Sequence, residues 1–277
     1  MVTEAFFERP SGRMVMSVET TRLLISLGAA VLGLLVGSFL NVVIWRVPRG
    51  ESVVSPPSAC PRCGHPLRPQ DNIPVVSWLV LRGKCRNCAE PISKRYPLVE
   101  LATAALFAVI VSWVPLVVLP AYLWLTAAGV ALTMIDIDHK RLPNVIVYPS
   151  AAVVGVWLVG ASLITDESGA AIRTLLAGVA LFAFYLLLAL VYPAGMGLGD
   201  VKLAFVLGMA LGWLSWSAVV VGTFLAFLIG AVVGLAVIAI RGGGRKTAIP
   251  FGPFMLAGAL IALFVSEPVS NWYLSLL

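Results

Sequence analysis

Long apolar runs alternate with short polar connections over most of this chain. Eight of the runs approach the roughly 20 residues that an α-helix needs to cross a bilayer. They lie near residues 23–45, 98–118, 120–137, 145–164, 171–193, 200–214, 217–240 and 251–266. The sequence therefore predicts an all-α polytopic membrane protein with about eight transmembrane helices, of which the sixth and eighth are short for a full span.

Composition supports a membrane protein and excludes an ordinary soluble domain. The chain is 60% hydrophobic and 12% charged, whereas soluble domains carry roughly 25% charged residues. Residues 1–22 are polar, and no small-residue cleavage site follows the first apolar run. We therefore interpret that run as a retained helix rather than a signal peptide.

Lysine and arginine positions predict the orientation. Nine of the 19 lie in residues 46–97, and six more fall on the same side if the spans alternate. Positive residues favour the cytoplasmic side of a membrane protein. We therefore expect residues 46–97 in the cytoplasm and both chain ends outside. The net charge of +6 follows this topology, so we expect no nucleic-acid partner.

Pairs of glycines four residues apart recur in the apolar runs, and such pairs let helices approach closely in lipid. They are Gly33/Gly37, Gly208/Gly212 and Gly230/Gly234. We expect close helix packing from them and no chemistry.

All four cysteines lie in the one long polar segment, as two C-x2-C pairs separated by 21 residues. Each pair can point two sulfurs at one ion, so the four together match a structural zinc site without an open coordination position. Disulfides are the alternative, but a reducing cytoplasm disfavours them. We expect His65 to lie beside the ion or in solvent, Gly64 to form a turn with positive φ, and zinc to be bound by Cys60, Cys63, Cys85 and Cys88.

Two acidic residues end the third apolar run, as Asp136-Ile-Asp138. Carboxylates at the edge of hydrocarbon are costly unless they are buried against protein or water, so they indicate function. Residues two positions apart on a helix point in different directions. At most one of the pair is therefore expected to face the bundle interior, and the other to be an ordinary interfacial acid.

Asp200 begins the sixth apolar run, within Gly197-Leu-Gly-Asp200. An aspartate in this place is typical of a helix cap. The alternative is a functional carboxylate, because Gly195, Gly197 and Gly199 remove side chains where an extended peptide could approach. Lys202 adds a charge that a cap does not need.

If Asp136 and Asp200 converge, they have the groups required to activate water. Two carboxylates in one low-dielectric site share a proton. The ionised member takes a proton from water as the water attacks a peptide carbonyl, and the protonated member donates to the carbonyl oxygen. Aspartic proteolysis at the cytoplasmic membrane face is the predicted reaction. The alternatives are a presenilin-like protease that cuts within a transmembrane helix, and a proton-coupled carrier with a zinc docking module.

The chain resembles the type IV prepilin peptidase family over nearly its whole length. Gly37-Ser-Phe-Leu-Asn-Val-Val-Ile-Trp-Arg-Val-Pro48 is similar to the signature at the end of the family's first helix. The cysteine pairs and Arg95-Tyr-Pro-Leu-Val-Glu100 resemble its cytoplasmic domain. Asp136-Ile-Asp-His-Lys-Arg-Leu-Pro-Asn144 and Gly197-Leu-Gly-Asp-Val-Lys202 resemble its two aspartate motifs.

The resemblance implies a bifunctional enzyme. Such proteins cut a short basic leader from prepilins or type II secretion pseudopilins after a glycine, then methylate the new N-terminus with S-adenosylmethionine. Carried over by motif, the catalytic acids fall on Asp136 and Asp200. Asp136 is favoured over Asp138 because the shorter archaeal relatives look like D-I-x5-P-N, a pattern that matches the segment from Asp136 to Asn144.

The resemblance also suggests four parts: residues 1–22 as a polar segment, 23–45 as the first helix, 46–97 as the cytoplasmic zinc-binding domain and 98–277 as the membrane-embedded peptidase domain. No glycine-rich fingerprint marks residues that bind S-adenosylmethionine. A basic leader would meet a basic segment, so attraction is expected from anionic lipid or from Glu51, Asp71, Glu90 or Glu100.

Overall fold

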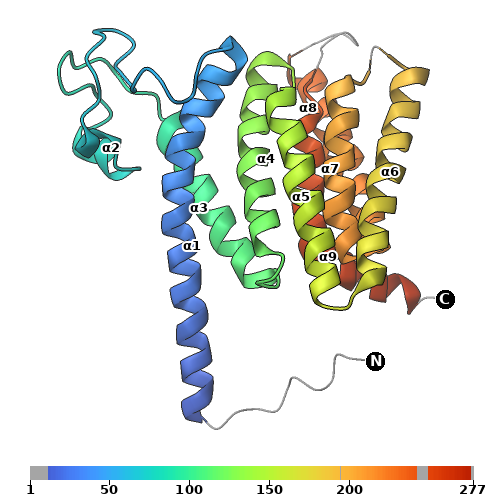
Figure 1. Cartoon of the computed structure of the whole chain (residues 1–277). Helices are drawn as coiled ribbons and strands as arrows, with labels where there is room; N and C mark the ends of the chain where they lie inside the picture. Colours follow the sequence, from blue (N-terminus) through green and yellow to red (C-terminus); the bar gives the residue numbers. More distant parts are fainter. Residues whose placement is uncertain (1–11, 194, 242–248, 276–277) are drawn as a thin grey trace.

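A bundle of long helices makes up most of the computed structural model, which describes residues 12–193, 195–241 and 249–275 (Figure 1). All eight predicted helices are present. They are α1 (Gly12–Arg46), α3 (Arg95–Trp113), α4 (Leu119–His139), α5 (Asn144–Ile164), α6 (Ser168–Val191), α7 (Leu198–Leu214), α8 (Trp216–Arg241) and α9 (Gly252–Leu274). No β-strand occurs in the described ranges, so the all-α prediction is confirmed for them.

Seven of these helices are long and apolar enough to cross a membrane. The exception is α7, whose 17 residues span only about 25 Å. The eighth predicted run is longer than expected, because α9 continues through Pro268 to Leu274. The first is longer too: α1 begins at Gly12, within the segment expected to be polar. Residues 1–11 of that segment lie outside the described residues, as do Arg245 and Lys246 of the basic count.

The shortest of the eight, α7, lies at the centre of the α4–α9 core. Apolar residues cover its whole circumference and eleven of its residues are buried, as expected for a helix surrounded by protein. Arg173 of α6 donates hydrogen bonds to the carbonyls of Gly212, Trp213 and Leu214 at its C-terminus. A cation is favourable there because of the helix dipole. This cation fixes the end of α7 that is remote from Asp200.

Two of the glycine pairs bring helix backbones into contact. A Cβ on Gly33 would lie 2.6 Å from Cα of Ala104 in α3, and one on Gly208 would lie 2.6 Å from the carbonyl of Ala177 in α6. The third pair is different, because Gly230 lies against the ring of Phe251 rather than against a backbone. The prediction of close packing is confirmed for the α1–α3 and α6–α7 pairs.

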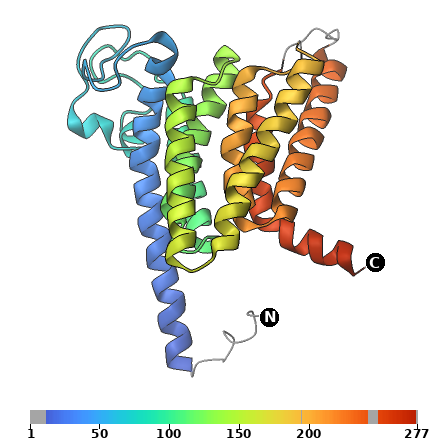
Figure 2. The ribbon, with the colours of Figure 1, turned by 45° about the vertical axis from the view of Figure 1, so that its right-hand side comes forward.

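The polar segment between α1 and α3 is compact but poor in regular structure. It contains two 3₁₀ turns, η1 (Val47–Arg49) and η2 (Pro69–Asn72), and one short helix, α2 (Val76–Val80). It lies beside the end of α1 and the beginning of α3 in both views (Figures 1 and 2). We call residues 46–94 the cysteine module.

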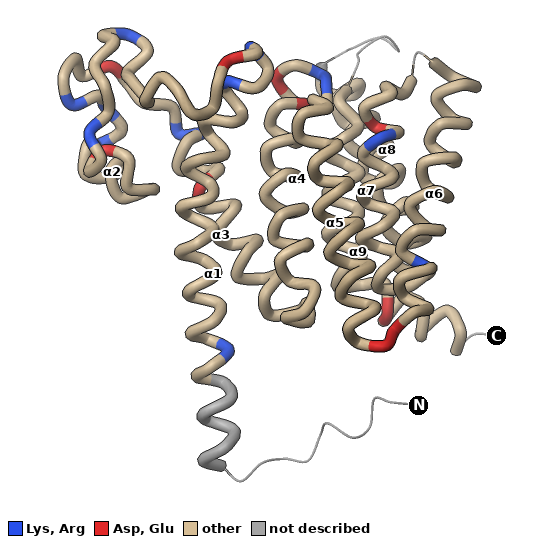
Figure 3. The backbone as a smooth tube through the Cα atoms, in the orientation of Figure 1, with Lys and Arg blue, Asp and Glu red and all other residues tan. Residues whose placement is uncertain are grey.

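Charged residues gather at one end of the bundle. Figure 3 shows most Lys and Arg in the cysteine module and in the connections at that same end. The start of α1 and the end of α9 lie at the opposite end. This arrangement places the connection after α4 and the start of α7 on the same face of the protein.

Candidate active site and metal centre

Asp200 lies in the first turn of α7 and is 9% exposed. Gly197 is the N-cap residue, and its N–H donates to Oδ2 of Asp200 over 3.1 Å. Asp200 is therefore not the N-cap that the simpler interpretation predicted; it is the third residue of α7, and its carboxylate binds back to the amide of the N-cap residue. Gly199 leaves room for Leu142 rather than for a peptide, because its Cβ would lie 3.1 Å from that of Leu142.

Asp136 lies in the last turn of α4 and is 4% exposed. Its Oδ2 accepts a hydrogen bond of 3.1 Å from the N–H of Gly252, the first residue of α9. A helix N-terminus stabilises a nearby negative charge. Both carboxylates lie at such a position, Asp136 at the N-terminus of α9 and Asp200 in the first turn of α7.

Gly252 is a site residue that the sequence interpretation missed. A Cβ there would lie 2.8 Å from Oδ2 of Asp136 and 3.2 Å from Cδ2 of Leu142, so only glycine lets α9 approach this closely. The one available signal was its position: Phe251-Gly252-Pro253 begins the last apolar run, and a proline in the first turn favours a helix start there.

Leu142 connects the two carboxylates. Its side chain is buried against Gly199, next to Asp200, and against Gly252, which binds Asp136. The structure thus places two acids that are 64 positions apart in sequence on either side of one leucine, at the same end of the bundle as the cysteine module.

Asp138 points elsewhere. Its Oδ2 forms an ion pair of 2.6 Å with Nη1 of Arg95 at the start of α3, and its side chain is 32% exposed. Arg95 also donates to the carbonyl of Met134. Asp138 therefore joins α3 to the end of α4, and only Asp136 of the pair faces the bundle interior.

Lys202 connects α7 to α5 and does not contact the acids. Its Nζ donates to Oδ1 of Asn144 over 3.0 Å and lies 5.3 Å from the ring centroid of Tyr148. Lys202 therefore binds Asn144, the last residue of the first aspartate motif, and its charge has no part in capping α7.

The four cysteines form one cluster, with all four sulfurs within 4.8 Å of one another. Sγ of Cys60 and Sγ of Cys88 are 3.8 Å apart. A tetrahedral zinc site with Zn–S bonds of about 2.3 Å places its sulfurs about 3.8 Å apart, so the donor set fits zinc. The backbone N–H groups of Cys63 and Arg62 donate to the sulfur of Cys60, and such hydrogen bonds favour the thiolate form that a metal requires.

Both cysteine pairs form the same turn. The amide of Gly64 donates to the carbonyl of Cys60, and that of Ala89 donates to the carbonyl of Cys85. Both residues have positive φ, 67° for Gly64 and 59° for Ala89. The turn predicted at Gly64 is confirmed and recurs in the second pair. His65 is exposed and supplies only its carbonyl, to the amide of Cys60.

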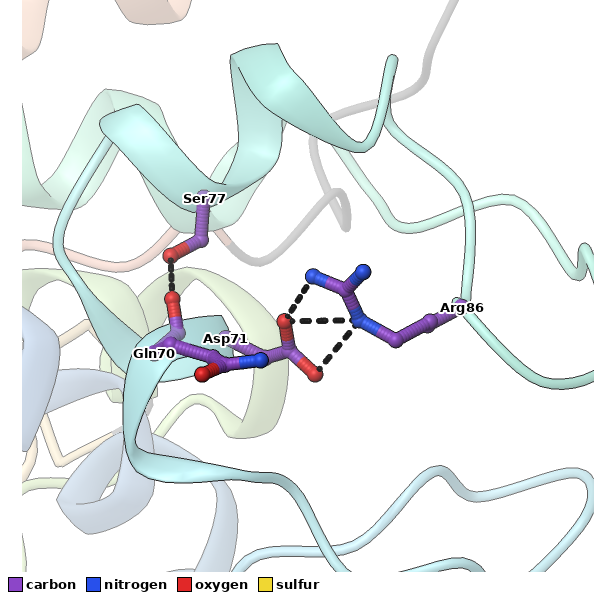
Figure 4. A network of polar contacts seen from close by, with 4 residues as sticks. All are labelled: Gln70, Asp71, Ser77 and Arg86. Carbon is purple, nitrogen blue, oxygen red and sulfur yellow. Dashed lines mark hydrogen bonds and ion pairs between the residues drawn. The ribbon is translucent and has the colours of Figure 1, made fainter.

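An ion pair attaches the second cysteine pair to the rest of the module (Figure 4). Arg86, between Cys85 and Cys88, donates to both carboxylate oxygens of Asp71, with Nη2 2.6 Å from Oδ1. Its hydrogen bonds lower the pKa of Asp71. The carbonyl of the neighbouring Gln70 accepts a hydrogen bond of 2.8 Å from the hydroxyl of Ser77. The short segment Gln70-Asp71 therefore holds both the second cysteine pair and α2.

Of the four acids proposed to attract a basic leader, three have partners. Asp71 binds Arg86, and Glu90 forms an ion pair of 3.1 Å with Arg62. Glu100 is buried and accepts the N–H of Val75 over 2.7 Å. Glu51 is exposed at the end of α1, which leaves it the most accessible of the four.

A half-open cavity of about 310 Å³ lies between α1 and residues 53–58 and 72–74 of the cysteine module, and two of its lining residues, Leu35 and Phe39, are more than half exposed. This volume lies within the roughly 300–1,000 Å³ of small-molecule sites. Its walls combine apolar and polar side chains, including Leu35, Ser38, Phe39, Val42 and Asn72. Ser38 also hydrogen-bonds the buried carboxyl group of Glu100, so a carboxyl group lies directly behind one wall.

Comparison with known proteins gives a consistent result. The family model described as the bacterial peptidase A24 N-terminal domain matches residues 31–114, and the type IV leader peptidase family model matches residues 123–235. Prepilin leader peptidase/N-methyltransferases from Pseudomonas aeruginosa and Aeromonas hydrophila are each 38% identical, over 88% and 87% of this chain and 91% of each relative. One from Stutzerimonas stutzeri is 37% identical over 89% of this chain and 92% of the relative. No solved structure matches.

Proposed function

The chain belongs to the type IV leader peptidase family, and we propose on that basis how its residues cleave prepilin leaders and methylate the exposed N-terminus. It is an aspartic prepilin peptidase with N-methyltransferase activity, as its relatives' names state. We propose that its substrates are prepilins of type IV pili or pseudopilins of type II secretion. These matches favour prepilin cleavage over a presenilin-like protease or a carrier.

We assign the peptidase reaction to Asp136 and Asp200. The observation that carries this assignment is the placement of both buried carboxylates at helix N-termini, each with Oδ2 held by a backbone N–H. Those hydrogen bonds fix the orientation of both groups, and the two together hold one proton, since two adjacent anions in a low-dielectric site are costly. Asp138 is excluded from the dyad in this proposal because its charge is used by Arg95.

The cleavage steps then follow from the shared proton. The ionised aspartate takes a proton from water as the water oxygen bonds to the scissile carbonyl carbon, and the protonated one donates to the carbonyl oxygen. As the tetrahedral intermediate collapses and the C–N bond breaks, the aspartate that took the water proton donates it to the leaving amine, and the other aspartate takes a proton from the gem-diol as the carboxylic acid product forms. That amine is the new pilin N-terminus, the group that methylation modifies.

The activity is tested by mass spectrometry of a prepilin reconstituted with the protein in lipid vesicles. We expect a product cut after the glycine that ends the leader and heavier by one methyl group when S-adenosylmethionine is present. An uncut substrate would overturn the peptidase assignment. A cut but unmethylated product would overturn the methyltransferase assignment alone.

We propose that the cysteine cluster holds a structural zinc ion. Four thiolates complete a tetrahedral shell and leave no position for water or substrate. The metal stabilises a module with little apolar core. Cys60→Ser and Cys85→Ser should each lower the zinc content measured by elemental analysis, and full zinc content in either variant would refute the proposal.

We further propose the cavity beside α1 as the place for S-adenosylmethionine. The fit rests on its volume, on the apolar residues Leu35 and Phe39 for the adenine ring, and on the carboxyl group of Glu100 behind Ser38 for the sulfonium cation. The cofactor supplies the methyl group, and the protein's role there is to bind and orient it. Ser38→Leu would fill the cavity, so it should weaken binding of S-adenosylmethionine in calorimetry and leave cleavage intact. Unchanged affinity would exclude this cavity.

The protein is a multi-pass protein of the bacterial inner membrane. We propose that the cysteine module and both aspartates face the cytoplasm, with both chain ends outside, because positive residues favour the cytoplasmic side. We also keep the division into a zinc-binding domain at 46–97 and a peptidase domain at 98–277 as a proposal. Reporter fusions test this orientation. It predicts that fusions after Leu214 and at the C-terminus report an outside location, and that a fusion after residue 90 reports the cytoplasm.

A further inference from the structure

The short helix α2 buries a polar residue and exposes several large apolar ones, the opposite of a helix on the surface of a soluble protein. Ser77 is 8% exposed and points into the module, where its hydroxyl binds the carbonyl of Gln70. Trp78 also packs inward, where its Nε1 donates to the carbonyl of Ile92, but four other large apolar residues of α2 and of the turn before it are between 50% and 70% exposed. They are Ile73, Val76, Leu79 and Val80, and we call them the α2 apolar face. A contiguous patch of this kind marks an interaction surface.

The position of α2 along α3 indicates which environment this face meets. The N–H of Val75, directly before α2, donates to Oε2 of Glu100 over 2.7 Å. Glu100 lies five residues after the first residue of α3, Arg95, and a helix rises 1.5 Å per residue. The backbone of Glu100, whose side chain holds Val75, therefore lies about 7–8 Å inward from the start of a helix long and apolar enough to span a membrane.

That depth matches an interfacial helix. Helices that lie in the plane of a membrane bury their apolar face roughly 5–10 Å into the boundary between headgroups and acyl chains. Both overall views place α2 beside the upper part of α1 and α3, lower than the loops of the cysteine module (Figures 1 and 2). If α3 spans the bilayer, α2 cannot be surrounded by bulk water.

Cations follow α2 at the place where headgroups would lie. Arg82 and Lys84 are exposed, and the ion pairs among the described residues involve Arg62, Arg86 and Arg95 instead. Basic residues next to an interfacial apolar face bind anionic lipid headgroups. The segment therefore has an apolar face for acyl chains and a basic end for headgroups.

We propose that residues 73–84 form a membrane anchor that lies in the leaflet on the side of the cysteine module. The α2 apolar face inserts among the acyl chains, and Arg82 and Lys84 bind anionic headgroups. Because Glu100 ties the entrance of α2 to α3, the anchor fixes the height of the cysteine module against the bilayer. This inference depends on α3 spanning the membrane and not on either enzymatic activity.

The test measures depth in the full-length protein. An environment-sensitive fluorescent amino acid is incorporated at Leu79 or Val80. The exposed control position is Asn87, between Cys85 and Cys88. The zinc content of each variant checks folding. The protein is reconstituted in phosphatidylcholine vesicles with and without phosphatidylglycerol, and the probe is quenched either by lipids with a nitroxide near the headgroup or by iodide in water.

We expect several-fold stronger lipid quenching at Leu79 and Val80 than at Asn87, with iodide quenching in the reverse order. In an Arg82→Gln/Lys84→Gln variant, the lipid quenching should decrease in vesicles that contain phosphatidylglycerol and stay unchanged in those that do not. Equal iodide access at all three positions would overturn the proposal. So would lipid quenching that disappears when prepilin is added, because the apolar face would then be a substrate surface.

Discussion

Substituting Gly252 with alanine tests how α9 positions Asp136. The new Cβ would lie 2.8 Å from Oδ2 of Asp136 and 3.2 Å from Cδ2 of Leu142. Ordinary contacts of a methyl group begin near 3.4 Å, so the carboxylate must move by about 0.5 Å or α9 must retreat. Either movement lengthens the hydrogen bond of 3.1 Å from the amide of residue 252 to Asp136.

The expected loss follows from that hydrogen bond. A hydrogen bond to a charged group contributes about 1.5–3 kcal/mol, and each 1.36 kcal/mol in the barrier changes a rate tenfold. Gly252→Ala should therefore lower the cleavage rate roughly 10- to 100-fold. Methylation of a pilin that has already been cut should be unaffected, because the proposed cofactor cavity lies beside α1.

The assay is single-turnover cleavage of a prepilin in vesicles, followed by mass spectrometry. Gly160→Ala is the matched control, because a Cβ at that position of α5 meets no atom within 4 Å. The thermal midpoint of each variant separates a local effect from unfolding. Cleavage by a folded Gly252→Ala protein at the parent rate would refute the idea that α9 holds Asp136 in its working position.

Further predictions concern the cysteine module. Gly64→Ala should destabilise the module by about 1 kcal/mol, because a residue with a Cβ is strained in the left-handed conformation. Ala89→Gly, at the matching position of the second cysteine pair, should stabilise the module or leave it unchanged. The rate of chelator-induced zinc release measures both effects, and equal effects of the two variants would contradict the shared turn. The lowered pKa of Asp71 means that its ion pair stabilises the fold fully above the ordinary aspartate pKa of about 3.9 and loses that effect as pH falls through the lower folded value. Asp71→Asn should therefore speed amide exchange around Arg86 at neutral pH and differ less from the parent at acidic pH. An equal difference at all pH values would contradict it.

Much of the fold follows from hydrophobic patterning alone, because helices in lipid need long apolar segments. The predicted bounds of all eight long helices lie within a few residues of the observed ones, except for the start of α1 and the end of α9. The longer last helix was missed because Pro268 and Glu267 interrupt the apolar run, although a proline in a membrane helix can be accommodated. Local spacing was also sufficient for the cysteine cluster, since two C-x2-C turns contain most of the geometry.

The candidate site depended on contacts that no local pattern contains. Asp136 meets Gly252 across 116 positions and Asp138 meets Arg95 across 43, and only the folded bundle distinguishes the buried acid from the paired one. Sequence spacing showed that the two acids point differently, but not which one points inward. The close approach of α9 could not be predicted, because a glycine before a helical proline is equally typical of a turn.

The central claim is that Asp136 and Asp200 form the catalytic pair and that Asp138 does not. The most direct measurement compares the single-turnover prepilin cleavage rates of Asp136→Asn, Asp200→Asn and Asp138→Asn in vesicles, with zinc content as the control for folding. We predict that the first two variants leave the prepilin uncut, and that Asp138→Asn still cuts it at a rate within about tenfold of the parent, since losing an exposed ion pair costs at most about 1 kcal/mol. Cleavage by Asp136→Asn, or its loss in a folded Asp138→Asn protein, would contradict the assignment.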